Sequence, residues 1–186
     1  SVTAVSGHVA LPVLVAAGRR SLPVRMEGLD PDAIITVLPG SSHMIEGRAP
    51  AAPGEAALGA QLAVELGVGI GDRVLVTPVQ GEHLELIVTG LIEAGFTGVD
   101  AQLVLTALET AAHASGPGAR WGYAVAVEPN ADLASLRLEI QQATGAWVQP
   151  WYEGRSSLLE ALAVERQVML WISLAAVATA AFATAS

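Results

Sequence analysis

The chain ends in a long run of residues without a charged side chain, and this run constrains the fold more than any other feature. It covers residues 168–186 and reads VMLWISLAAVATAAFATAS. As a helix it would span about 28 Å, close to the thickness of a bilayer core. A buried core helix or a helix at a subunit interface is the alternative, but helices of this length in a core usually carry a polar stripe. We therefore predict the start of a transmembrane helix, and not a signal peptide, because the run lies at the C-terminus.

Charge and residue types exclude several classes of function. The 18 acidic side chains outnumber the 9 basic ones, all of which are arginine, so the net charge of the 186 residues is −9. Nucleic-acid binders need clustered cations for phosphate contacts, so we expect no nucleic-acid partner. Without lysine or cysteine the chain lacks a P-loop lysine, a Schiff-base lysine and a thiol nucleophile. Because it starts at Ser1 and stops inside the apolar run, we interpret it as a piece, cut at both ends, of a longer membrane protein.

The hydrophobic period predicts a mixed order of strands and helices before the apolar run. Apolar residues recur every second position in strands and about every 3.6 positions in helices. This criterion predicts a hairpin over 5–29 that turns at 17–20, then a short helix capped by Asp30 and a loop over 39–54. It predicts further strands at 55–58, 74–76, 84–88, 101–106, 123–127 and 147–151. It predicts further helices at 59–66, 106–115 and 131–144. From Arg155 the helical period continues without Gly or Pro, so the last helix is expected to enter the membrane unbroken.

No residues with catalytic or metal-binding spacing are found. The four histidines have no neighbour at the spacing of zinc motifs: His8, His43, His83 and His113. The glycines of GVGIGD, residues 67–72, would suit a dinucleotide loop only if they followed a strand and opened a helix. Here they follow a predicted helix and open a predicted strand, so we interpret them as a helix C-cap and a turn. The sequence therefore predicts no catalytic, cofactor-binding or metal-binding residues and no enzyme activity in this chain.

Tryptophans gather around the last predicted strands. They are Trp121, Trp147 and Trp151. We favour packing in a core or an interface for them, and an apolar groove for lipid is the alternative. Trp171, within the apolar run, would suit an anchor at the membrane interface.

An ordered set of segments carries a resemblance to one family of membrane proteins. The most specific segment is LGAQLAVELGVGIGD, residues 58–72, which follows the pattern LG-x-x-LA-x-x-LG-V-x-x-GD. The other segments, in chain order, are VRMEGLDP (24–31), MIEGRAP (44–50), LELIVTGLIEAGFTGVD (84–100), WVQPWYEGRSSLLEALAVERQVMLWISL (147–174) and AAFATAS (180–186). Together they resemble the extracytoplasmic domain of MacB-like ABC-transporter permeases, of the lipoprotein-releasing LolC/LolE type.

The resemblance implies an α+β fold, a MacB-like periplasmic core domain of two mixed α/β lobes followed by a long helix that enters the membrane. It implies an extracytoplasmic domain over 1–152 with a middle lobe inserted at about 30–120, a helical stalk over 153–167 and the start of a transmembrane helix over 168–186. The whole protein would be a permease subunit in the inner (plasma) membrane that transmits ATP-driven movement to its outer domain. Its expected partners are a separate ABC ATPase, a second permease chain as homo- or heterodimer, the membrane, and cargo such as a lipoprotein or another lipid.

The chain departs from the LolC type at one hairpin. In LolC-type permeases a long hairpin loop hooks a periplasmic lipoprotein carrier. The corresponding connection in this chain is only residues 78–83, so no hook is expected. Ala183 also stands where the family has Asn. The chain would thus match a hookless LolE-like partner or a related permease with another cargo. A bitopic sensor whose outer domain binds a ligand or protein remains an alternative, and a soluble enzyme with a buried C-terminal helix is a third. The flanking sequence distinguishes them, because a permease predicts one apolar segment before Ser1 and two after Ser186.

Overall fold

The computed structural model describes residues 1–149 except 39–41, 80–81, 96, 117–118 and 129. The chain divides into two compact units, Ser1–Asn130 and Ala131–Ser186. Among the described residues, no helix is both long and apolar enough to span a bilayer. The predicted stalk, 153–167, and the predicted membrane segment, 168–186, lie outside the described residues, so both stay predictions, and so does the domain boundary at 152.

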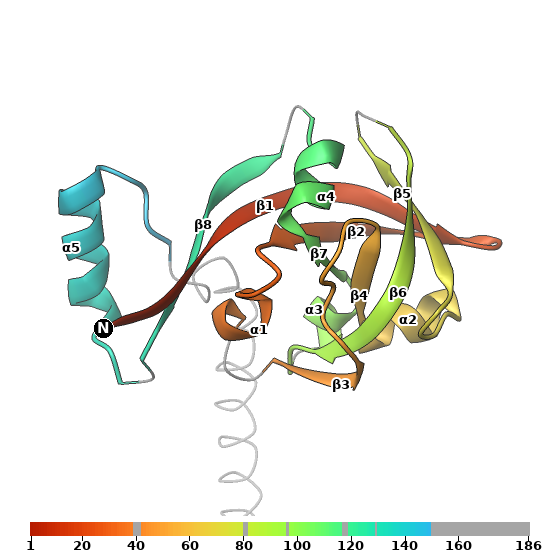
Figure 1. The fold of residues 1–186 in the computed structure, drawn as a ribbon, viewed down its shortest axis with the longest axis horizontal. Helices are drawn as coiled ribbons and strands as arrows, with labels where there is room; N and C mark the ends of the chain where they lie inside the picture. Colours follow the sequence, from red (N-terminus) through yellow and green to blue (C-terminus); the bar gives the residue numbers. More distant parts are fainter. Residues whose placement is uncertain (39–41, 80–81, 96, 117–118, 129, 150–186) are drawn as a thin grey trace, which may run out of the picture. The chain divides into compact units, whose positions relative to one another are not determined.

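Strands dominate the first unit and a single helix is described in the second. In chain order the elements are β1 (Val2–Ala17), β2 (Arg20–Leu29), α1 (Ile34–Val37), β3 (His43–Gly47), β4 (Glu55–Gly59), α2 (Ala60–Leu66), β5 (Arg73–Pro78), β6 (Leu84–Glu93), α3 (Thr97–Asp100), β7 (Leu103–Ala107), α4 (Leu108–Ala114), β8 (Arg120–Val127) and α5 (Leu133–Thr144). The expected mixed α/β character is confirmed, with the sheet as its main component (Figure 1).

Six of the strands form a closed sheet, which we call the ring. They follow one another in the order β2-β7-β4-β6-β5-β1, and β1 pairs with β2 again to complete the ring. Closure depends on the length of β1, which pairs with β2 along 8–17 on one edge and with β5 along 13–16 on the other. The N-terminal part of β1 extends beyond the ring and pairs with β8. The middle segment 30–120, expected as an inserted lobe, therefore shares one sheet with the hairpin that precedes it.

The core fills both sides of the central strands. Alternate residues of β1, Val9 to Val15, join Leu58 of β4 and Leu62 of α2 in one buried cluster. A second cluster lies on the other side of β4 and β7 and includes Ile34 of α1 and Leu105 of β7. Because both faces of β7 are covered, all five of its residues are buried. This explains why β7 reads as a continuous run, LVLTA, and not as an alternating strand.

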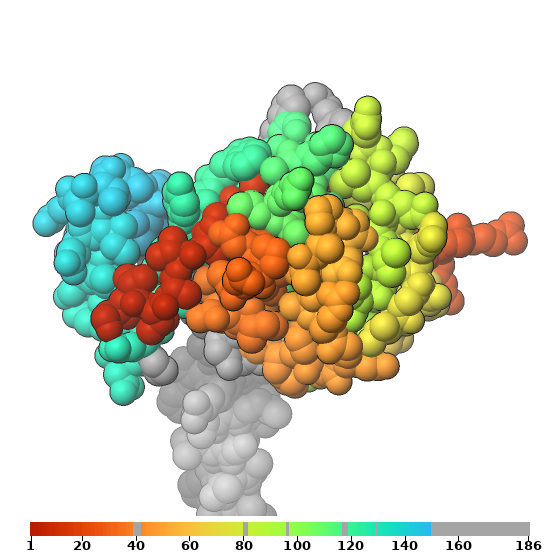
Figure 2. All heavy atoms as spheres, in the orientation of Figure 1, coloured from red at the N-terminus to blue at the C-terminus, as the bar shows by residue number. Residues whose placement is uncertain are grey.

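The β1–β2 hairpin confirms the sequence prediction and carries two consecutive arginines, Arg19 and Arg20, at its tip. Gly18 takes a φ of +57°, a left-handed conformation that favours glycine in a tight turn. The tip projects from the rest of the first unit (Figure 2). Arg20 is tied back, because its Nη1 donates to the backbone oxygen of Glu65 at 2.7 Å.

The predicted N-cap role of Asp30 is wrong. Helix α1 begins after Ala33 and no side chain caps it. The carboxylate of Asp30 instead accepts a hydrogen bond from the backbone N–H of Gly7 at 2.7 Å, and the Asp30 N–H donates to Ser6 Oγ at 2.9 Å. These bonds continue the contact between β1 and the end of β2 beyond the last ladder pair, His8 with Leu29. The carboxylate is thus used for a long-range contact.

Two other expectations about secondary structure need correction. Strand β3 lies within the stretch 39–54 that was expected to be a loop, where it pairs with β6. Residues 147–149, the described part of the expected closing strand, are not in a strand. Helix α5 is confirmed, with Asp132 as N-cap and Gly145 as a left-handed C-cap. The 3.6-residue period of this helix predicts buried positions for Leu133, Leu136, Ile140 and Ala143, but the first three are half-buried and Ala143 is exposed.

Glu55 orders the loop that leads into β4, and its loss should make stability depend less on pH. Its carboxylate binds Arg48 in a bidentate pair at 2.5 and 2.7 Å and accepts from the N–H groups of Ala51 and Ala52. The hydrogen bonds from Arg48 are the main cause that lowers the Glu55 pKa to about 2. A carboxyl whose pKa is lowered by folding stabilises the protein above its unfolded pKa and loses that effect as pH falls through the folded value. The contribution should therefore be present at neutral pH and decline between about pH 5 and pH 2.

We expect Glu55→Gln to lower the free energy of unfolding by about 2 kcal/mol at neutral pH, because hydrogen bonds to a charged group are lost. Thermal unfolding of the 186-residue chain in detergent, repeated across this pH range, measures the effect, and the two proteins should converge at the acid end. Glu85→Gln is the matched control. It breaks the exposed Arg73–Glu85 pair at 3.0 Å, which should cost under about 1 kcal/mol. An equal effect of both substitutions at all pH values would contradict the prediction.

Candidate interaction surfaces

The four histidines of the first unit lie on β1, on β3, in the connection between β5 and β6, and on α4. His8 and His43 each face one carboxylate, Glu27 at 3.7 Å and Glu93 at 3.5 Å, and His83 Nδ1 lies 3.0 Å from Thr77 Oγ1. In the described part of the chain, no three His, Cys, Asp or Glu side chains come together in a way that could hold a metal ion.

The glycine-rich segment 67–72 is a helix end and a turn, as the sequence predicted. Gly67 caps α2 with a φ of +74°, and its N–H donates to the oxygens of Ala63 and Val64. Asp72 then closes the turn, since its carboxylate accepts from the Gly69 N–H at 2.8 Å. The chain continues directly into β5, so these glycines connect a helix to a strand.

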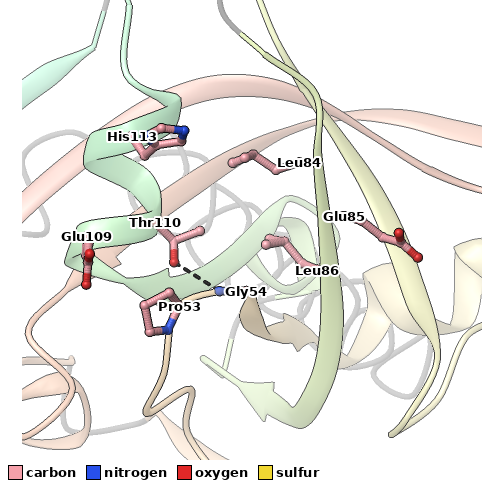
Figure 3. A pocket seen from close by; sticks show the side chains of 8 residues that line it. All are labelled: Pro53, Gly54, Leu84, Glu85, Leu86, Glu109, Thr110 and His113. Atoms are coloured by element: carbon pink, nitrogen blue, oxygen red, sulfur yellow. Dashed lines mark hydrogen bonds between the residues drawn. The ribbon is translucent and has the colours of Figure 1, made fainter.

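A shallow hollow of about 210 Å³ lies between α4 and β6. Figure 3 shows its lining, which comprises Pro53, Gly54, Leu84, Glu85, Leu86, Glu109, Thr110 and His113. Leu84 and Leu86 point toward α4, and Glu85 points away from it (Figure 3). At the base, Thr110 Oγ1 accepts a hydrogen bond from the Gly54 N–H at 3.3 Å. The hollow combines an apolar floor with two titratable side chains one helical turn apart, and its size suits a small apolar group.

Two exposed aromatic residues of the first unit lie on the ribbon formed by β1 and β8. Trp121 is 63% exposed and Tyr123 is 78% exposed, and Val125 continues the same face of β8. Val5, paired with Val125 across the two strands, is exposed as well. We call this set the ribbon face: Val5, Trp121, Tyr123 and Val125. Neither Trp121 nor Trp147, which is 78% exposed in the second unit, packs in a core. Packing in an interface, the other form of that prediction, stays a prediction, and Trp151 lies outside the described residues.

The small residues of β8 explain which of its faces is covered. Large and small residues alternate in WGYAVAV, residues 121–127. Ala124 packs against the buried cluster that contains Ile34 of α1, so the face of small residues is the one that a helix can approach. The alternation is visible in the sequence, but it does not indicate which of the two faces is buried. The side of the strand that α1 covers could not be read from β8 alone.

Solved structures give the fold a precedent, whereas no family model and no curated protein matches the chain. The periplasmic region of MacB from Actinobacillus actinomycetemcomitans is similar with a TM-score of 0.53 and 10% identity, over 77% of this chain and 68% of that one. The extracellular domain of YknZ, described as a noncanonic ABC-type transporter from Gram-positive bacteria, is similar with a TM-score of 0.55 and 9% identity, over 78% of each chain. Identities this low show the fold alone: this chain shares its fold with the periplasmic region of MacB and with the extracellular domain of YknZ.

Proposed function

We propose that this chain belongs to a permease subunit of an ABC transporter and forms its extracytoplasmic domain and the start of the following membrane helix. The observation that carries the proposal is the fold, which is shared over 77% and 78% of the chain with outer domains of two such transporters. The uncharged run 168–186 supports it, because such a domain must be followed by a membrane segment. The proposed location is the inner (plasma) membrane, with residues 1–152 outside the cytoplasm.

The proposed mechanism is mechanical and not chemical. ATP is hydrolysed by a separate ATPase subunit or domain, and the movement passes along the membrane helices to the outer domain, which engages cargo such as a lipoprotein or another lipid. A second permease chain completes the transporter. In support of a binding role, the ribbon face brings two exposed aromatic side chains and two exposed valines together on one pair of strands.

The assignment can be tested by co-purification. The full-length protein that contains this segment should be expressed together with the product of any ABC ATPase gene that neighbours its own and solubilised in detergent. We expect the two to purify as one complex with ATPase activity. A protein with a single membrane span that is followed by a kinase-like or cyclase-like region, and that binds no ATPase, would contradict the proposal and favour the sensor alternative.

The lever function of the last helix leads to a separate prediction. Residues 155–186 contain neither Gly nor Pro, so the sequence provides no hinge there. Ala163→Pro removes a helical hydrogen bond and introduces a steric clash. It should therefore interrupt the mechanical connection between the membrane segment and the outer domain. We expect ATP hydrolysis to continue while cargo release is lost in reconstituted vesicles. Ala163→Leu, which keeps the helix, is the control, and unchanged release with the proline variant would exclude the lever.

We further propose that this chain does not dock a lipoprotein carrier through a hook. Strand β5 ends at Pro78 and β6 begins at Leu84, which leaves a connection of ordinary hairpin length. A hook that enters another protein needs two strands projecting beyond the domain. If the transporter releases lipoproteins, the hook therefore belongs to a second, different permease chain.

A further inference from the structure

The hollow between α4 and β6 lies at one end of the ring. Helix α4 begins directly after the last residue of β7. Because β4 runs antiparallel to β7 and parallel to β6, the starts of β4 and β6 lie at this same end. Leu86 of β6 and Ala111 of α4 both belong to the buried cluster inside the ring. The hollow is therefore at the mouth of a closed sheet, where binding sites of β-barrels commonly lie.

Helix α4 is held on the wall opposite to the hollow. In the order of the ring, β6 is separated from β2 by two strands in either direction, β7 and β4 or β1 and β5, so β2 and β6 lie across from each other. A side chain at Gly28 of β2 would collide with Ala111 of α4, so the helix packs against the backbone of β2. At the base, the Gly54 N–H donates to Thr110 Oγ1 at 3.3 Å. Since α4 cannot move toward β6 without losing these contacts, the hollow is preformed.

The two walls of the hollow differ in chemistry. On β6, Leu84 and Leu86 point toward the helix (Figure 3). On α4, Glu109 and His113 are exposed and lie one helical turn apart. The Glu85 carboxylate points away from α4 and binds Arg73 at 3.0 Å, so Glu109 supplies the negative charge of the hollow. An occupant would thus meet apolar surface on one side, and a carboxylate and an imidazole on the other.

The size and the charge of the hollow suit one arginine side chain. Its volume of about 210 Å³ is below the roughly 300–1,000 Å³ of pockets for whole small molecules. The apolar stem of an arginine covers apolar surface, and its guanidinium binds a carboxylate through two hydrogen bonds and stacks on aromatic rings. Arginine is also among the residues that most often anchor protein interfaces. The net charge of −9 favours the approach of a basic segment.

We propose that the hollow between α4 and β6 binds an arginine side chain from a basic segment of a partner protein. The stem of the arginine lies on Leu84 and Leu86, and its guanidinium reaches Glu109 and His113. The inference is independent of the proposed function, because it uses only the hollow in the first unit, and its test gives the same answer whether or not an ATPase co-purifies.

Nuclear magnetic resonance of the 186-residue chain in detergent, with ¹³C-labelled histidine, tests the site. The chain has four histidines, and a His113→Gln variant identifies the signal of His113. N-acetyl-arginine methylamide is the probe, and N-acetyl-citrulline methylamide is its neutral counterpart of the same shape. We expect the arginine probe to shift the His113 signal in a saturable way and the citrulline probe to bind more weakly. The signals of His8 and His43 should stay in place and report that the fold is intact.

Substitutions in each wall separate this site from a general attraction of cations. Glu109→Gln should weaken binding of the arginine probe by about fivefold, as expected for an exposed ion pair. Glu46→Gln, which removes an exposed carboxylate of β3, is the matched control and should leave binding unchanged. Leu84→Phe fills the hollow and should abolish the shift of His113, whereas Leu75→Phe on the exposed face of β5 should not.

Four outcomes would overturn the proposal. They are an unmoved His113 signal, equal binding of the arginine and citrulline probes, equal weakening by Glu109→Gln and Glu46→Gln, and tighter binding of n-butylammonium than of the arginine probe. The last of these would assign the hollow to a small free amine and not to a segment of a partner protein.

Discussion

Replacing Gly59 by alanine is expected to destabilise the first unit strongly, although the added group is a single methyl. A Cβ at this position would lie 2.0 Å from the backbone oxygen of Asp100 and 2.8 Å from its Cα. Backbone atoms cannot rotate away as the end of a side chain can, so α3 would have to move away from the end of β4. Asp100 is itself buried, and its carboxylate holds the Ala94 N–H at 2.7 Å. Movement of α3 would therefore also disturb the hydrogen bond between Ala94 and Asp100.

We expect Gly59→Ala to lower the free energy of unfolding by about 3 kcal/mol, at the upper end of the usual cost of overpacking. Chemical denaturation of the 186-residue chain in detergent measures it. Gly69→Ala is the matched control, because a Cβ at Gly69 meets no atom within 4 Å. The φ of Gly59 is −57°, so backbone strain is not a competing explanation. A loss equal to that of the control would mean that α3 does not pack as closely on β4 as the structure shows.

The features that local sequence patterns determine were predicted well. The hairpin of β1 and β2 shows a two-residue period on both sides of a glycine turn. Helix α2 shows apolar residues on one face and a glycine where the helix ends. Both features depend on residues that are close in sequence. The local conformational preference of each residue therefore agrees with the secondary structure that it adopts.

Closure of the ring could not be predicted in the same way. It requires β2 to pair in parallel with β7 and β4 to pair in parallel with β6, between segments far apart in the chain. No short pattern specifies which distant strands meet. Strand β3 was missed for a related reason: its residues are mostly exposed, and its pairing with β6 alone makes it a strand. Proline and glycine around it gave the stretch the composition of a loop.

The candidate surface was hidden from the sequence because burial depends on what lies above a strand. Trp121 and Tyr123 alternate with small residues, and either face of such a strand can be the inner one. Ala124, on the small face, packs against a buried cluster that includes Ile34 of α1, which is distant in sequence. Asp30 shows the same limit, since its position before a proline favours a helix cap, and the N–H of Gly7 binds its carboxylate instead. In both cases a long-range partner overrides a local preference.

Leu58 should be among the residues whose truncation costs most, because it lies in the ring formed by the six strands. Its side chain is fully buried, with 0% exposed, in the cluster that joins β1, β4 and α2. Leu58→Ala removes buried methyl groups and leaves a cavity that surrounding strands, hydrogen-bonded on both sides, cannot fill, so we expect a loss of about 3–4 kcal/mol in the free energy of unfolding. Leu75→Ala on β5 is the control of the same chemistry, because that side chain is 45% exposed and should lose under about 1 kcal/mol. Denaturant unfolding of both variants measures the two losses in the free energy of unfolding. Equal losses would mean that Leu58 is not enclosed, and that the ring of strands does not surround a packed interior.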